Sequence, residues 1–265
     1  MNIIIRELKA NLKPLIIWSV AQMFVILSGM MKYKGYADSG VDINSLFGDG
    51  AEGLLKAFGM NGLDLSKVDA YYTVFFLYFM LLAAIHAVML GAVLISKEER
   101  DHSADFLFSK PVKRYQVVTS KLIAGSINIF VFNIVTYVTS VVMIATYNDG
   151  DGLSGKVGLL MVALFILQVF FLALGAMFGA VLKTTKIATS AATGFVLATF
   201  FMSILADISE KVDFLKYLTP FKAFQSRIVI FDGELSLVST AILLALSAGL
   251  LAVTYKKFHA RDLTT

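Results

Sequence analysis

Residues 70–96 read AYYTVFFLYFMLLAAIHAVMLGAVLIS and contain no Asp, Glu, Lys or Arg. An α-helix of about 20 apolar residues crosses a hydrocarbon core of ~30 Å. The stretch is longer than this, so it predicts a transmembrane helix. Immediately after it the sequence becomes densely charged, as KEERDHSADFLFSKPVKRYQVVTSK over residues 97–121.

The rest of the chain repeats this contrast. Hydrophobic residues make up 58% of the 265 residues and charged residues 16%, whereas about 25% of an ordinary soluble domain is charged. An open sheet cannot satisfy its backbone in lipid, so the sequence predicts an all-α integral membrane protein with six transmembrane helices in a single domain. The predicted spans are about 14–32, 70–96, 122–147, 157–182, 187–206 and 235–255.

Charge asymmetry predicts the orientation of these spans. An even number of spans places both termini on one side, with residues 97–121 and 183–186. That side has a net charge of +8 and the other side −4. Lys and Arg are retained on the cytoplasmic side, so both termini are predicted to be cytoplasmic. The same asymmetry explains the sequence pI of about 9.1 without a nucleic-acid partner.

Three further segments have predicted places. Residues 1–13 read as a short amphipathic helix that lies along the inner leaflet. Residues 33–69 form the first outer loop, to which we assign no chemistry. Residues 207–233 are too charged to span and predict a partly embedded outer hairpin that caps the bundle.

The sequence offers no set of catalytic or metal-binding residues. There are no cysteines, and the three histidines lie on different segments at no ligand spacing. Gly150–Lys156 resembles a phosphate-binding loop, but Val157 replaces the hydroxyl that would hold Mg²⁺, and the loop joins two membrane helices. We therefore expect a non-catalytic chain without a metal site.

His86 is the one titratable group of the Asp, Glu, Lys, Arg and His set that is predicted near the middle of the membrane. An intramembrane ionisable residue is a candidate functional residue. It continues a helical stripe that includes Tyr72, Phe76, Phe79 and Ala83. This stripe either lines a pathway or forms an aromatic packing face, and packing is the commoner role of such stripes.

Small residues at four-residue spacing mark places where helices can approach closely. Gly175 and Gly179 form one such pair in the fourth span, and Ala245 and Gly249 form another in the sixth.

The charged segment 97–121 predicts a compact cytoplasmic elbow. Ala104, Leu107 and Phe108 share one helical face, and Pro111 ends this short helix and opens a second one that continues into the third span. An apolar knob with a charged rim is typical of a protein docking surface. The alternative is a solvated loop whose charges only fix the topology.

Two parts of the chain carry a family resemblance. The first is Glu98-Glu99 followed by Phe106-Leu107, Ser109-x-Pro111-Val112-x-Arg114 and Lys121. The second is the ending Tyr255-x-x-Phe258-x-x-Arg261-Asp262-Leu263. Together they resemble the membrane permeases of the type-2 ABC exporter family, although His102-Ser103 stands where the family often has Gly-Thr.

The resemblance implies a coupling role for the elbow. It would dock into a separate ABC ATP-binding subunit, which holds ATP and Mg²⁺, while this chain itself holds no cofactor. A second permease copy would complete a homodimer or heterodimer in the lipid of a prokaryotic plasma membrane. The residues implied in coupling are Glu98, Glu99, Arg100, Phe106, Leu107, Pro111 and Arg114.

The resemblance also places the substrate path between the second and fifth spans of the two copies. The residues expected along it are Phe76, Phe79, His86, Thr193 and Thr199. The expected function is ATP-driven export of a hydrophobic or amphipathic cargo such as a lipid, drug or antimicrobial peptide. The alternative is a mechanotransmitting or sensing subunit that acts on an envelope protein.

Overall fold

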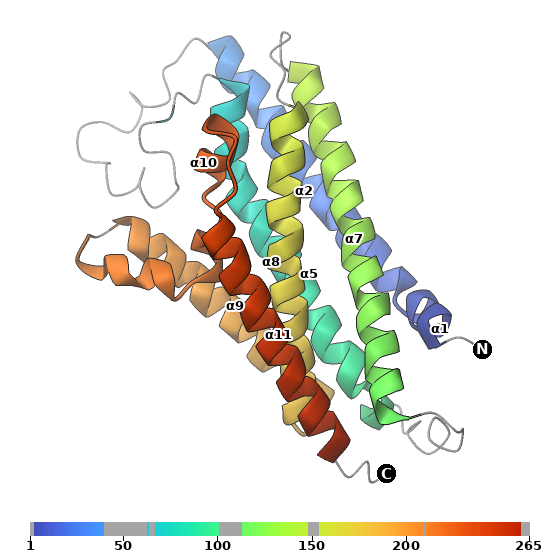
Figure 1. Ribbon diagram of the computed structural model, residues 1–265. Coiled ribbons are helices and arrows are strands. Elements are labelled where there is room, and N and C mark those ends of the chain that lie inside the picture. Colours follow the sequence, from blue (N-terminus) through green and yellow to red (C-terminus); the bar gives the residue numbers. More distant parts are fainter. Residues whose placement is uncertain are drawn as a thin grey trace.

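The computed structural model describes residues 3–39, 63, 67–100, 113–147, 154–208 and 210–260. These residues form a bundle of long helices, shown in Figure 1. No β-strand occurs among them. The elements are α1 (Ile3–Ala10), α2 (Leu12–Ser39), α5 (Val68–Arg100), α7 (Arg114–Tyr147), α8 (Ser154–Val181), α9 (Thr185–Ile208), η1 (Glu210–Tyr217), η2 (Pro220–Lys222), α10 (Ser226–Phe231) and α11 (Leu237–Ala260).

Six of these helices, α2, α5, α7, α8, α9 and α11, are long and apolar enough to cross a membrane. This confirms the predicted all-α membrane protein with six spans. The helices extend beyond the predicted apolar stretches, most clearly in α7, which begins at Arg114 rather than near residue 122. Charges mark the edge of the apolar stretch, but a helix that satisfies its own backbone continues past that edge.

Both termini lie at the same end of the bundle (Figure 1). We call this the terminal end and the opposite end the distal end. The last turn of α5, the first turn of α7 and the short connection between α8 and α9 also lie at the terminal end. This grouping is the one expected for an even number of spans.

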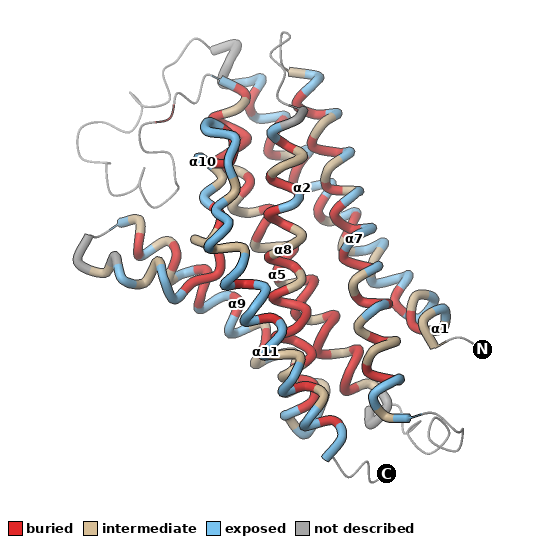
Figure 2. Tube along the Cα trace, in the orientation of Figure 1, coloured by how far each residue is buried: buried red, intermediate tan, exposed pale blue. Residues whose placement is uncertain are grey.

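The core is built around α5 and α8. α8 is the main packing partner of α5, and Figure 2 shows buried residues running along both helices. The peripheral helices α2, α7, α9 and α11 keep exposed apolar side chains such as Phe24, Val142, Phe201 and Leu246. In a membrane-spanning bundle these faces contact lipid tails.

Glycines let α5 and α8 touch backbone to backbone. A Cβ atom at Gly175 would overlap the carbonyl oxygen of Val88, and one at Gly179 would lie 2.6 Å from that of Ala92. In turn, a Cβ atom at Gly91 of α5 would overlap the carbonyl oxygen of Leu172 in α8. The close approach predicted from Gly175 and Gly179 is confirmed, and it occurs within this chain.

The pair in the sixth span behaves differently. Among the residues that the structure describes, a Cβ atom at Gly249 would meet no heavy atom within 4 Å. Within the described part of the chain, Ala245 and Gly249 therefore do not mark a close helix contact at Gly249.

The segment after α9 turns back into the bundle. Thr219 Oγ1 donates a hydrogen bond of 2.8 Å to the carbonyl of Thr199, in the middle of α9. The buried ring of Phe221 lies 5.4 Å from that of Phe171 and 5.5 Å from that of Phe200, centroid to centroid. This segment is thus fastened into the apolar core and does not project freely from the distal end.

Candidate functional site: a polar clasp at the end of α5

The last turns of α5 are held by polar contacts to three other helices. The contacts involve Leu94, Ser96 and Lys97 of α5, with Glu7 of α1, Lys121 of α7 and Thr185 of α9. We call these six residues the terminal clasp. α5 continues to Arg100, and the predicted coupling segment follows. The clasp therefore stands where that segment joins the bundle.

The contact to α1 is a buried ion pair. Glu7 is fully buried, and its carboxylate accepts a hydrogen bond from the ammonium of Lys97. Arg6 Nη2 also lies 3.1 Å from Glu7 Oε1. A charge away from water is costly unless it is paired and hydrogen-bonded. Glu7 therefore ties α1 to the end of α5.

Asn11 shapes the junction between α1 and α2. Its side-chain Nδ2 donates to the carbonyl of Glu7 at 2.8 Å, and its backbone nitrogen donates to the same oxygen at 3.0 Å. The buried face of α1 is thus polar, whereas Ile5 is about half exposed. The amphipathic helix predicted from residues 1–13 turns Glu7, not only its apolar side chains, toward the protein.

The contact to α7 uses a buried lysine. Lys121 is fully buried, and its ammonium donates to the carbonyl of Leu94. One turn later, a Cβ atom at Gly125 would lie 2.8 Å from Leu94 Cδ1. The absence of a side chain at Gly125 lets α7 lie close enough to α5 for Lys121 to reach this carbonyl.

The contact to α9 joins two hydroxyls. Ser96 Oγ lies 2.9 Å from Thr185 Oγ1, and Thr185 Oγ1 donates to the carbonyl of Ser96 at 3.1 Å. Thr185 is the first residue of α9. The beginning of α9 is therefore fastened to the end of α5.

The other side of the coupling segment is anchored as well. Arg114 is the first residue of α7, and its Nη1 donates to the carbonyl of His259 at 2.8 Å. Thr119 Oγ1 and the hydroxyl of Tyr255 lie 2.8 Å apart. The start of α7 is thus linked to the last turns of α11, so both stretches that flank residues 101–112 are held to the bundle.

Most of the predicted coupling residues follow the terminal clasp in the sequence. Glu98, Glu99 and Arg100 belong to the last turn of α5, but their side chains are outside the described residues, as are Phe106, Leu107 and Pro111. Arg114 is described and contacts α11. The coupling role of all seven stays a prediction.

The predicted path residues on α5 lie inside the bundle. Phe76 and Phe79 are fully buried, with ring centroids 6.3 Å apart. The imidazole of His86 stacks on Phe132 at 4.6 Å and lies 5.8 Å from the ring of Trp18. Its Nδ1 atom has no hydrogen-bond partner among the described residues. These three residues are brought together on one buried face.

The two predicted path residues on α9 have different surroundings. Thr199 is buried, and its hydroxyl donates to the carbonyl of Phe195 at 2.9 Å in its own helix. Thr193 is half-buried. Among the described residues, the hydroxyl of Thr199 bonds only its own helix, and the place of both threonines along a cargo path stays a prediction.

The sequence did not indicate Glu7 as a functional residue. It indicated Lys121 only as part of the family motif at the start of the third predicted span. Both were counted with the charges of the cytoplasmic side. For Glu7, one signal was available in the sequence: Asn11 follows four residues later, which places two polar side chains on one helical face. For Lys121, the corresponding signal was Gly125, because a glycine in a membrane helix can mark a close contact with another helix.

A bundle of six membrane-length helices, with a cluster of polar contacts at the end of its central helix α5, defines a multi-pass integral membrane protein. The family model described as ABC-2 family transporter protein matches residues 1–263. The chain therefore belongs to the ABC-2 transporter family. A search of curated proteins finds no significant match to it.

Family membership fixes the general role of the chain. It is a permease component of an ABC transporter, a membrane transport part that is generally non-catalytic. The family implies association with an ATP-binding subunit in the membrane.

Thr185→Val is expected to lower the free energy of unfolding by about 1 kcal/mol, because it removes the hydroxyl that joins α9 to Ser96 while keeping the side-chain shape. Thr189→Val is the matched control, since among the described residues its hydroxyl bonds only its own helix, at 2.9 Å to the Thr185 carbonyl and 3.1 Å to that of Lys186. Unfolding by sodium dodecyl sulfate, followed by circular dichroism, measures both. Equal losses in the two variants would contradict the role of Thr185.

Proposed function

We propose that this chain is the transmembrane permease subunit of an ATP-driven ABC exporter, coupled to a separate ATPase subunit through residues 97–121. Its expected cargo is hydrophobic or amphipathic, such as a lipid, drug or antimicrobial peptide. The chain supplies the coupling surface and the translocation path, and the partner supplies ATP hydrolysis.

The terminal clasp is the observation that carries this proposal. A force on the segment after α5 would reach α1 through Lys97 and Glu7, α7 through Lys121, and α9 through Ser96 and Thr185. Without such contacts the last turn of α5 could fray without moving its neighbours. A motion of the partner would therefore be transmitted as movement of packed helices.

The glycine contacts support a mechanism of rigid-body motion. Backbone contact at Gly91, Gly175 and Gly179 holds α5 and α8 together where residues 88–92 meet residues 172–179. This pair would move as one unit, while α2 and α9, which expose apolar faces, would shift against it. Opening toward either side of the membrane would occur around this central pair.

The character of the interior supports an apolar or amphipathic cargo. The buried polar side chains in the middle of α7 and α8 are neutral, among them Asn128, Asn133 and Gln168. Asn133 and Gln168 bond one another at 3.2 Å. An ionic cargo would need fixed charges or polar groups to replace its hydration, and a lipid-like cargo would not.

Replacement of both Phe106 and Leu107 by Asp is expected to reduce the amount of copurifying ATPase at least tenfold, because charges would replace the predicted apolar knob. Tyr217→Asp is the control, since Tyr217 is 91% exposed and lies far from the terminal end in the segment after α9. The measurement is the ATPase activity recovered with the tagged permease. Undiminished recovery from a correctly folded double variant would refute docking through this segment.

A second measurement separates export from mechanotransmission. Reconstituted complex is tested for stimulation of ATPase activity by phospholipids and by amphipathic peptides in vesicles. Stimulation of severalfold by a cargo supports export. Copurification of the ATPase without stimulation by any tested cargo would instead favour the mechanotransmitting alternative.

A further inference from the structure

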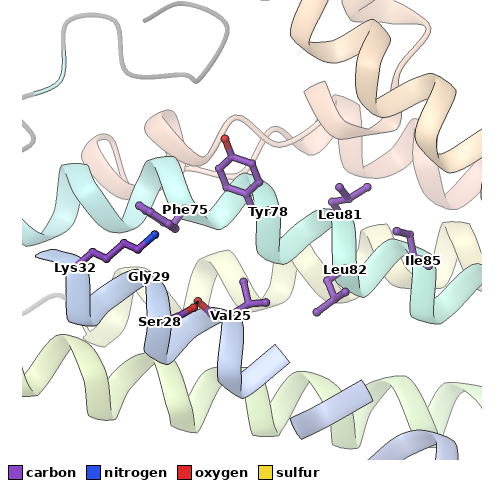
Figure 3. Close-up of a pocket in the computed structure, with 9 residues that line it drawn as sticks. All are labelled: Val25, Ser28, Gly29, Lys32, Phe75, Tyr78, Leu81, Leu82 and Ile85. Atoms are coloured by element: carbon purple, nitrogen blue, oxygen red, sulfur yellow. Dashed lines mark hydrogen bonds between the residues drawn. The ribbon is translucent and has the colours of Figure 1, made fainter. Parts of the chain in front are cut away.

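A groove lies between α2 and α5, away from the terminal clasp. Its volume is about 360 Å³, within the ~300–1,000 Å³ of ligand pockets. Its walls are mostly apolar and include Val25 of α2 with Phe75, Leu82 and Ile85 of α5, and Lys32 of α2 stands at one end. Figure 3 shows these side chains along the two helices.

Contacts near both ends of the groove fix the spacing of the two helices. Toward the distal end, the hydroxyl of Tyr71 donates to the carbonyl of Gly29 at 3.0 Å. Toward the terminal end, the rings of Trp18 and His86 lie 5.8 Å apart. In this conformation the two contacts hold α2 against α5 on both sides of the groove.

The groove is reached from the bilayer. Val25, Leu82 and Ile85, which line the groove, are only partly buried, so the groove opens at the surface of the bundle. In a membrane-spanning helix such a surface contacts hydrocarbon. A molecule that enters the groove from this side is therefore itself dissolved in the membrane.

Lys32 gives the groove a polar end. Its side chain is exposed and extends from α2 toward Phe75 (Figure 3). It forms no ion pair with any residue that the structure describes. Val25 precedes it by seven residues, about 10 Å along the helix. A positive charge at one end of an apolar groove complements an amphiphile with an anionic head and a hydrocarbon tail.

We propose that this groove binds one anionic phospholipid, with its phosphate at the Lys32 ammonium and an acyl chain along Val25, Leu82 and Ile85. The site is separate from the coupling segment. Lipid binding at the groove is measured without ATPase or ATP. A negative result would therefore refute the lipid site without bearing on the proposed export function.

Tryptophan fluorescence tests this proposal. Trp18 is the one tryptophan of the chain, so Trp18→Phe with Tyr78→Trp leaves a single reporter in the groove. In vesicles, brominated phosphatidylglycerol is expected to quench it with about fivefold preference over brominated phosphatidylcholine, since one lysine near an anionic lipid gives a preference of this order. Lys32→Gln is expected to remove the preference, whereas Lys34→Gln, also exposed on α2, is expected to retain it.

Two further variants examine the apolar part of the site. Val25→Phe is expected to reduce quenching by both lipids because it fills the groove, and Met23→Phe, on the exposed face, is expected not to. Equal quenching by the two lipids in the parent protein, or a preference that survives Lys32→Gln, would overturn the proposal. So would efficient oxidative cross-linking of Leu82→Cys between copies, since the chain has no other cysteine and the groove would then hold a second copy.

Discussion

Gly175→Ala is expected to prevent normal assembly of the bundle, with a loss of at least about 3 kcal/mol in the free energy of unfolding. The added methyl group would overlap the carbonyl oxygen of Val88 and lie 2.9 Å from the backbone nitrogen of Ala92. Both atoms belong to the backbone of α5, so they cannot move aside as a side chain could. The two helices would have to separate, and packing on both sides of Gly175 would be lost.

Gly158→Ala is the matched control for this prediction. Gly158 lies in α8 as well, but a Cβ atom there would meet no heavy atom of the described residues within 4 Å. Alanine is a better helix former than glycine, so this variant is expected to gain up to about 1 kcal/mol. Unfolding by sodium dodecyl sulfate measures both variants. An unchanged midpoint for Gly175→Ala would show that α5 and α8 do not pack at the distance described.

Glu7→Ala is expected to destabilise the chain by about 3 kcal/mol and to free the last turn of α5. It removes the carboxylate that pairs with Lys97 and contacts Arg6, and loss of one partner leaves a partly buried charge unpaired. The side chain of Lys97 is only 13% exposed, so water replaces the lost partner incompletely. Unfolding midpoints and hydrogen exchange of residues 94–100 measure the two effects.

The double variant Glu7→Ala with Lys97→Ala separates the ion pair from the packing of α1. It is expected to be more stable than Glu7→Ala alone, because no unpaired ammonium remains. Lys9→Ala, an exposed change in α1, is expected to stay within about 0.5 kcal/mol of the parent protein. Additive losses in the double variant would show that Glu7 and Lys97 act independently.

The six spans could be predicted because lipid imposes a simple rule on sequence. A helix in hydrocarbon must be long and almost free of charge, and residues 70–96 show that pattern without reference to any neighbour. The close approach of α8 at Gly175 and Gly179 was also visible in the sequence, but its partner was not. The same four-residue spacing in α11 makes no such contact at Gly249 with any residue that the structure describes.

The predicted sites could be located only in part. Phe76, Phe79 and His86 share a face because a helix places residues three and four apart side by side, and the structure puts that face inside the bundle. A helical stripe alone does not reveal which neighbour covers it. The ring of His86 is stacked against Phe132, which lies more than forty residues away in the sequence.

The sequence by itself determined which segments enter the membrane, how many there are and that both termini share one side, since these depend on hydropathy summed along the chain. Only the tertiary structure decided that Glu7 and Lys121, which count in sequence as ordinary cytoplasmic charges, are buried partners of the end of α5. The reason is physical: the cost of a charge depends on what surrounds it in space. Its surroundings here come from helices that are distant in sequence. A local signal such as Asn11 near Glu7 or Gly125 near Lys121 could mark the position, but it could not specify the partner.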